Sequence, residues 1–123
     1  MGNPHAVLLV DDVTTAEVQA IGAYIESHAL FPNRVNVGFL QIVNTSEAKL
    51  RVFERGVGET MACGTGACAA MVVAVRHNLL QAKATISLPG GDLLMQWSPG
   101  ESVMMTGPAS CVFEGKMTWP LLK

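Results

Sequence analysis

Residues 54–70, ERGVGETMACGTGACAA, combine charged residues, turn glycines and a cysteine, and they lead into a run of small apolar residues that predicts a helix. Cys63 therefore stands at a helix N-terminus, where partial positive charge and unpaired N–H groups favour the thiolate over the thiol. The N–H groups of Gly64 and Thr65 are placed to receive a substrate carboxylate, because glycines leave room for its approach. The pattern predicts a basic thiolate beside an anion-binding site.

A second interpretation of Cys63 is that it packs as a small apolar residue in a glycine turn, which is the commoner state of a free cysteine. Its position alone leaves both interpretations open. Cys68 is turned about 140° away from Cys63 on the same helix and faces the expected apolar interior, so it is predicted to belong to the core. With Cys111 there are three cysteines, so at least one thiol stays free.

Neither a metal site nor a phosphate-binding loop is predicted. A zinc site needs three or four ligands at short spacing, and the pair Cys63 and Cys68 does not offer that spacing. Gly56 and Gly58 lack the third glycine of a dinucleotide-binding motif, and no Gly-Lys-Ser/Thr follows them.

The three histidines differ in their prospects as partners of the Cys63 thiol. His77 falls at the far end of the predicted helix, and His28 lies at the end of a surface helix, where a solvated role is more common. Only His5 remains a candidate.

The composition limits the class of partner. Half of the 123 residues are hydrophobic, 15% are charged and the formal net charge is -2, so no basic surface for nucleic acid is expected. The sparse charge suggests that a partner or second domain covers part of an apolar face. The longest small-apolar run, 66–75, is too short to cross a membrane. The chain starts without the pattern of a secretory signal, so a reducing cytoplasm is the expected compartment.

Helix and strand patterns cover most of the chain. Thr14 and Glu17 have the spacing of a capping box for a helix to about Ala29, with Val18, Ile21, Ile25 and Ala29 on its inward stripe. The second predicted helix runs from 64 or 65 to about 80. β-rich segments predict strands at 6–10, 35–43, 50–54, 84–88, 93–97, 103–106 and 109–113.

The second helix is apolar on every side for almost three turns, which is typical of a buried helix. Its small residues let strands approach closely. The expected fold is therefore α+β, with a mostly antiparallel sheet curled around a central helix and one further amphipathic helix. In strand 50–54, Leu50, Val52 and Glu54 should share one face, while Arg51, Phe53 and Arg55 share the other.

Five strings in order resemble the diaminopimelate epimerases that work without pyridoxal phosphate. They span nearly the whole chain: Met1-Gly2-Asn3-Pro4-His5, residues 34–39 (RVNVGF), residues 54–69 (ERGVGETMACGTGACA), Leu88-Pro89-Gly90-Gly91, and residues 105–109 (MTGPA). The resemblance implies a two-domain enzyme with one cysteine from each domain and no cofactor. Residues 1–123 resemble only its C-terminal domain, so the N-terminal domain and its cysteine are absent.

The resemblance also assigns roles to individual residues. Cys63 corresponds to the acid/base cysteine of this half, and the amides of Gly64 and Thr65 to the groups that bind the carboxylate at the reacting carbon. The substrate's distal end would be held by Asn3, Asn36 and Arg55. His5 and Glu54 correspond to residues that position the substrate and tune the cysteines.

The implied reaction interconverts LL- and meso-diaminopimelate, a precursor of lysine and peptidoglycan, by two-cysteine proton transfer. The chain alone is then expected to be inactive, and its uncovered apolar face to favour self-association. Proline racemase-like enzymes of the same architecture also begin a helix with Cys-Gly-Thr-Gly, although the lead-in at 54–60 fits diaminopimelate epimerase better. The related phenazine-biosynthesis isomerases lack the cysteine. A thiol-bearing binding module without catalysis is the alternative outside the enzymes.

Overall fold

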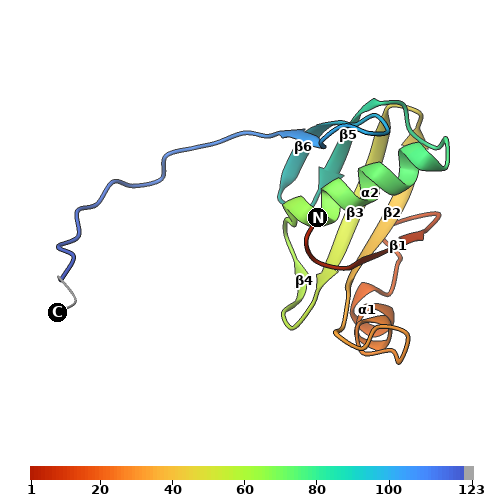
Figure 1. The fold of residues 1–123 in the computed structure, drawn as a ribbon, viewed down its shortest axis with the longest axis horizontal. Helices are drawn as coiled ribbons and strands as arrows, with labels where there is room; N and C mark the ends of the chain where they lie inside the picture. The colour runs from red at the N-terminus through yellow and green to blue at the C-terminus, as the bar shows by residue number, and fades with distance from the viewer. Residues whose placement is uncertain (121–123) are drawn as a thin grey trace.

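The computed structural model describes residues 1–120, which form a mixed sheet of seven strands with two helices. The elements follow one another as β1 (His5–Leu9), α1 (Val18–Glu26), β2 (Asn36–Asn44), β3 (Glu47–Glu54), β4 (Gly58–Thr60), α2 (Gly64–Arg76), β5 (Lys83–Leu88), β6 (Gly91–Gln96) and β7 (Met104–Thr106) (Figure 1).

The strand order along the sheet is β1-β2-β3-β5-β6-β7, and β4 pairs with β3 off this path. The pairs β1/β2 and β3/β5 are parallel, and the other four pairs are antiparallel. The predicted α+β class and mostly antiparallel sheet are confirmed. The strand β4 was not predicted, because Gly56 and Gly58 signalled only a break, whereas the chain turns there and pairs back onto β3.

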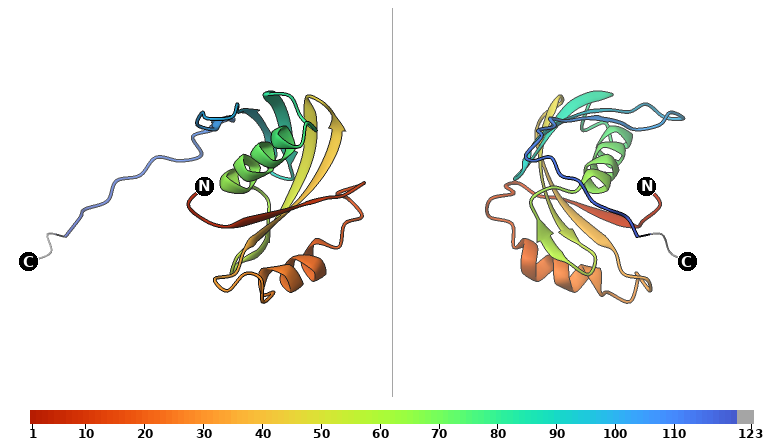
Figure 2. Two further views of the ribbon diagram at one scale, coloured as in Figure 1. Left: turned by 45° about the vertical axis from the view of Figure 1, so that its right-hand side comes forward. Right: turned by 90° about the vertical axis from the view of Figure 1, so that its left-hand side faces the viewer.

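The two helices lie on opposite faces of the sheet (Figure 2). α2 contributes to one core together with Leu50 and Val52, while Val18 of α1 packs with Phe53 in a second core. The predicted alternation along β3 is therefore confirmed for these residues.

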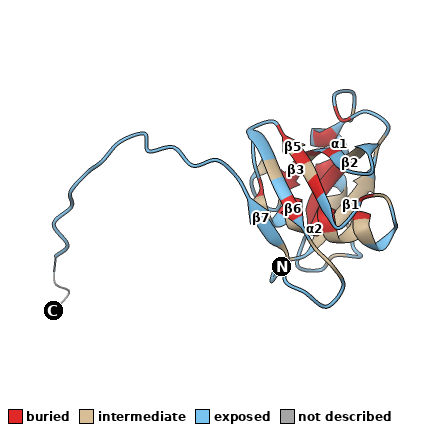
Figure 3. Ribbon diagram, turned by 90° about the horizontal axis from the view of Figure 1, so that it is seen from above, coloured by how far each residue is buried: buried red, intermediate tan, exposed pale blue. Residues whose placement is uncertain are grey.

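The prediction that α2 is buried on every side is wrong. Its buried residues form one face, whereas Cys68, Val72, Val73 and Val75 are only half-buried (Figure 3). The sheet curls around the helix from one direction and leaves the opposite side less covered. α2 also ends at Arg76 instead of near Leu80, because His77 is its C-cap and Asn78 adopts a left-handed conformation with φ of 57°.

The predicted start of α1 was wrong as well. The helix begins at Val18, and Thr14 does not cap it, because its N–H and hydroxyl both donate to Asp12 Oδ1 at 2.8 and 2.7 Å. The N-cap is Glu17, whose side chain makes no capping bond. The aspartate thus captures Thr14 in a local turn, which competes with helix formation.

The inward face of α1 also differs from the predicted stripe. Its buried residues are Val18, Gly22 and Glu26, whereas Ile21 is 38% exposed and Ile25 half-buried. Ala29 lies beyond the helix and is exposed. Val18 was placed correctly, and Ile25 packs against the same core as a partly buried residue. Gly22 and Glu26 were missed, since a glycine and a carboxylate carry no hydrophobic signal.

The predicted strand at 109–113 was wrong. Residues 107–120 form no strand, are exposed, and run away from the domain beyond β7 (Figures 1 and 3). The apolar residues of this segment suit a strand, but a strand also needs a neighbouring edge to pair with. Val112 and Phe113 instead stay 86% and 82% exposed.

Candidate active site

Cys63 is the N-cap of α2, as its sequence position predicted. Its backbone is extended, with φ of -141° and ψ of 102°, and its Sγ accepts the N–H of Gly66 at 3.4 Å. A Cβ at position 66 would lie 3.1 Å from that sulfur and 3.1 Å from Val52 Cγ2. Glycine at 66 therefore allows the sulfur to approach the helix amides. Cys63 itself is only 8% exposed.

The turn between β5 and β6 braces the segment that leads into Cys63. The Gly90 N–H donates to the carbonyl of Met61 at 2.7 Å, and a Cβ at Gly90 would lie 2.9 Å from that oxygen. A side chain at position 90 would therefore displace the backbone just before the thiol. This contact gives the Pro-Gly-Gly string a physical role in the site.

The N-terminal residues bring a row of polar groups to the thiol. They pass beside the beginning of α2 (Figure 1), where Thr65 Oγ1 lies 3.7 Å from Cys63 Sγ and accepts from Asn3 Nδ2 at 3.4 Å. His5 Nε2 in turn lies 3.2 Å from Asn3 Oδ1. Since Thr65 Oγ1 accepts from Asn3, its own hydrogen is free to point at the sulfur. Four predicted residues thus form one connected group.

Asn36 connects this group to the β3–β4 turn. The residue is 5% exposed; its Nδ2 donates to the Pro4 carbonyl at 3.0 Å, and its Oδ1 accepts the Arg55 N–H at 2.9 Å. Both ends of the amide are thus engaged by backbone groups. The structure gives Asn36 a part in holding the site together, and its contact with substrate stays a prediction.

Glu54 and Arg55 follow one another at the end of β3. Glu54 is half-buried and accepts from the Thr60 hydroxyl at 2.6 Å, while Arg55 is exposed and donates from Nη1 to the Asn33 carbonyl at 3.1 Å. The charges of both residues act on His5, in opposite directions. Glu54 and Arg55, both predicted site residues, therefore lie close enough to His5 for their charges to act on it.

Burial and then the positive charge of the N-terminal ammonium hold the pKa of His5 below its ordinary value of 6.5; the Glu54 carboxylate opposes this effect, and Arg55 adds to it. The imidazole is therefore neutral at pH 7. Because folding lowers this pKa, the contribution of His5 to stability declines as the pH falls from 6.5 through the folded-state value.

We expect an NMR titration of the His5 ring to show these signs. Replacing Arg55 with alanine should raise the pKa of His5, and Glu54→Gln should lower it further, because each change removes one of the opposing charges. His5 is half-exposed, so both displacements should be modest. Shifts of the same sign in the two variants would contradict the arrangement.

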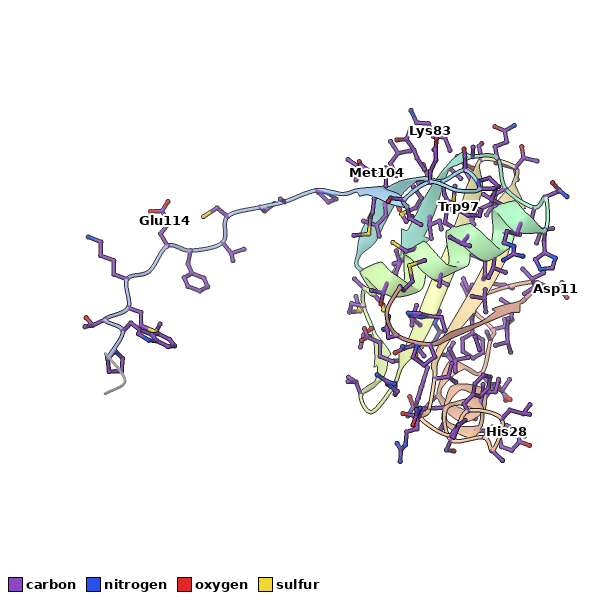
Figure 4. All side chains as sticks on the ribbon, viewed as in Figure 1. Asp11, His28, Lys83, Trp97, Met104 and Glu114 are labelled. Atoms are coloured by element: carbon purple, nitrogen blue, oxygen red, sulfur yellow. The ribbon has the colours of Figure 1, made fainter. Side chains whose placement is uncertain are left out.

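Cys68, Cys111 and the other two histidines lie outside this group; Cys111 is exposed in the segment beyond β7. Burial raises the pKa of the Cys68 thiol, which packs at the edge of the α2 core as a partly buried residue. His28 follows α1, far from the start of α2 (Figure 4), and His77 caps the opposite end of α2. Within residues 1–120, no three His, Cys, Asp or Glu side chains are grouped to hold a metal ion. No helix in that range has the length and hydropathy to span a membrane.

Sequence reasoning missed two residues that shape the site. Glu26 of α1 is buried and accepts the Gly56 N–H from the turn after Arg55. Met105 of β7 borders the start of α2, since a Cβ at Gly64 would lie 3.2 Å from its Cε. The spacing of Val18, Gly22 and Glu26 at four-residue intervals was the available signal for Glu26.

The fold is similar to that of solved proteins of the PhzF phenazine-biosynthesis family. A PhzF-family protein from Enterococcus faecalis superimposes with a TM-score of 0.60 at 20% identity, covering 80% of this chain and 35% of that one. A PhzF-family protein from Bacillus anthracis gives 0.62 at 23% identity, covering 85% and 34%.

The sequence defines the family more narrowly. The profile described as Diaminopimelate epimerase matches residues 1–112, and the chain belongs to that family. It is 59% identical to the diaminopimelate epimerase of Neisseria meningitidis serogroup A over 97% of this chain and 43% of that protein. The enzyme of Chromobacterium violaceum is 58% identical over 95% and 43%. The chain therefore spans less than half the length of these relatives.

Proposed function

We propose that this chain forms the C-terminal half of an epimerase that interconverts LL- and meso-diaminopimelate with two cysteines and no cofactor. The observation that carries the proposal is the Cys63 thiol at the start of α2, linked through Thr65 and Asn3 to His5. Family membership supports the isomerase class. The cytoplasmic location stays a prediction.

Inversion at a carbon without a cofactor needs one base and one acid on opposite faces of that carbon. In one direction, the Cys63 thiolate takes the α-proton and becomes a thiol, while a thiol of the complementary half gives its proton to the opposite face and becomes a thiolate. The reverse reaction exchanges the two roles. The electron pair left on the α-carbon is delocalised into the carboxylate.

Other groups would bind the substrate around this step. The N–H groups of Gly64 and Thr65 would hold the reacting carboxylate and stabilise its growing negative charge. Arg55 can bind the distal carboxylate with two parallel hydrogen bonds. Asn3 and Asn36 are proposed to add neutral contacts to the distal end.

His5 and Glu54 are proposed to orient the substrate and tune the thiols. A neutral His5 suits the orienting role, because a neutral imidazole carries one hydrogen-bond donor and one acceptor. Glu54, fixed by Thr60, supplies a carboxylate for the substrate's ammonium group.

The complementary half is proposed to cover the face around Cys63. Apolar side chains surround this part of the molecule: Met61, two residues before the thiol, is 64% exposed, and Met105, beside Gly64, is 47% exposed. An uncovered apolar rim of this kind marks an interaction surface. Closing it would place the second cysteine opposite the first and exclude water.

The purified chain is expected to show no interconversion of the two isomers, because it carries one of the two proton-transfer groups. Adding the part of the Neisseria meningitidis relative that the chain does not cover should restore activity. The assay is α-proton exchange in D2O followed by NMR, in material from a host lacking its own epimerase. Exchange by the chain alone would contradict the two-cysteine proposal, and proline racemisation by the mixture would favour the proline racemase-like alternative. Reversible ligand binding without exchange would favour the binding module.

Self-association through uncovered apolar residues is expected at high concentration. Replacing Met61 and Met105 with serine should reduce it, because these side chains, 64% and 47% exposed, form the uncovered apolar rim around Cys63. The matched control is Tyr24→Ser on α1, where the side chain is 68% exposed and lies on the other face of the sheet. Light scattering measures the mass. A monodisperse monomer for the unmodified chain would count against the expectation.

A further inference from the structure

The turn that carries Glu54 and Arg55 is fixed by three successive N–H groups. Arg55 N–H donates to Asn36 Oδ1 at 2.9 Å, Gly56 N–H to Glu26 Oε1 at 2.5 Å, and Val57 N–H to the Glu54 carbonyl at 3.1 Å. Two of the three acceptors are therefore side chains from elements distant in sequence.

The Glu26 carboxylate is the charged member of this set. It belongs to the last residue of α1, is 8% exposed, and reaches the turn because α1 packs against β3 and β4 (Figure 1). Gly56 has φ of 75°, a conformation that directs its N–H toward the helix and that other residues rarely adopt. A hydrogen bond from an amide to an ionised carboxylate is shorter and stronger than a neutral one.

Pairing with Arg34 does not account for the position of Glu26. The Arg34 Nη1 lies 3.5 Å from the same Oε1, and that side chain is 59% exposed. A 3.5 Å pair with an exposed, solvated guanidinium contributes little stability, whereas burial of the Glu26 carboxylate carries a desolvation cost. The short contact of Glu26 is with the turn.

We propose that Glu26 is a positioning residue of the active site, which holds the Gly56 amide and thereby fixes the direction in which Arg55 and Glu54 leave β3. The consequence for substrate rests on the proposed function, in which those two side chains contact diaminopimelate. α1, which contributes no side chain to the thiol site, thus acts on that site through one carboxylate.

The structural half of the proposal is tested in the full chain by NMR. Glu26→Gln keeps the shape of the side chain and removes its charge. The Gly56 amide should then shift upfield and exchange with solvent about ten- to a hundredfold faster, as expected for loss of a charge-assisted bond. Glu17→Gln is the matched control, since Glu17 is exposed at the other end of α1. An unchanged Gly56 amide in Glu26→Gln would overturn the proposal.

A measurement on the unmodified chain tests the same contact even if the Glu26→Gln variant fails to fold. Scalar coupling across the hydrogen bond between the Gly56 nitrogen and the Glu26 carboxyl carbon should be detectable, because the two groups lie at the short end of the hydrogen-bond range. Absence of this coupling in a well-dispersed spectrum would refute the contact itself.

The consequence for substrate binding is tested in the mixture of this chain with the complementary half of the enzyme. Glu26→Gln should raise KM about tenfold and change kcat less than threefold, because it loosens the groups that hold the distal end of the substrate. A role in stability alone would lower the amount of active enzyme and leave KM unchanged, which would overturn the positioning role. If the unmodified mixture were inactive, the proposed function would fail. The NMR result for the Gly56 amide would still decide whether Glu26 holds that amide.

Discussion

Replacement of Cys63 by alanine is expected to reduce epimerisation by the reconstituted two-half enzyme about a thousandfold, within the range for loss of a positioned acid or base. The thiol is the only group at the start of α2 that can both take and return a proton there; its neighbour Thr65 carries a hydroxyl that is far less acidic. The measurement is kcat for interconversion of the purified isomers in both directions.

Cys63→Ser tests the reason for that loss. The serine hydroxyl can accept the Gly66 N–H and so preserve the start of α2, but it cannot act as the base at neutral pH. It should therefore fold as the unmodified chain does and be nearly as inactive as alanine. Cys111→Ser, in the exposed segment, is the control and should retain full activity. Serine activity near that of cysteine would remove Cys63 from the proton-transfer step.

The part of the site that depends on local structure could be predicted from the sequence. The helix-capping position of Cys63 follows from glycines and small residues next to it, and the structure confirms that its sulfur accepts a helix amide. The closeness of Asn3 to the thiol came from the family resemblance, whereas His5 had remained as a candidate partner of the thiol after the other two histidines were set aside. No periodicity links residues 3 and 65; only the parallel pairing of β1 with β2 brings the chain terminus there.

Glu26 shows why other residues that shape the site could not be predicted from the sequence. A glutamate in a helix normally marks the solvent side, so its charge argued against burial, and only its four-residue spacing from Gly22 and Val18 pointed toward the sheet. Its burial depends on the left-handed turn at Gly56, thirty residues later, and on the packing of α1 against β3. The same helix begins at Val18, later in the chain than predicted, because Thr14 is hydrogen-bonded to Asp12 and does not cap it. Both errors come from polar side chains that bond to groups outside the helix: Asp12 to Thr14 two residues away, and Glu26 to Gly56 thirty residues away.

The substitution Gly22→Ala is expected to destabilise the chain, although alanine normally favours a helix by about 1 kcal/mol over glycine. A Cβ at position 22 would lie 2.5 Å from Phe53 Cγ and 2.6 Å from its Cβ. These atoms are the base of the side chain, so rotation of the ring cannot move them away. Phe53 is itself 5% exposed within the core beneath α1.

The added methyl group would therefore have to push α1 off the sheet, and overpacking of this kind costs about 1–3 kcal/mol or more. With contacts this short, we expect a net loss of about 2 kcal/mol and a fall in Tm of roughly 6–12 °C. The reciprocal control is Ala23→Gly at the neighbouring exposed position, which should cost about 1 kcal/mol through helix propensity alone. Urea unfolding of both variants decides the matter, because a stabilised Gly22→Ala would mean that α1 does not rest on Phe53. Since Glu26 ends the same helix, displacement of α1 should also increase exchange of the Gly56 amide, which connects the packing of this helix to the geometry of Arg55.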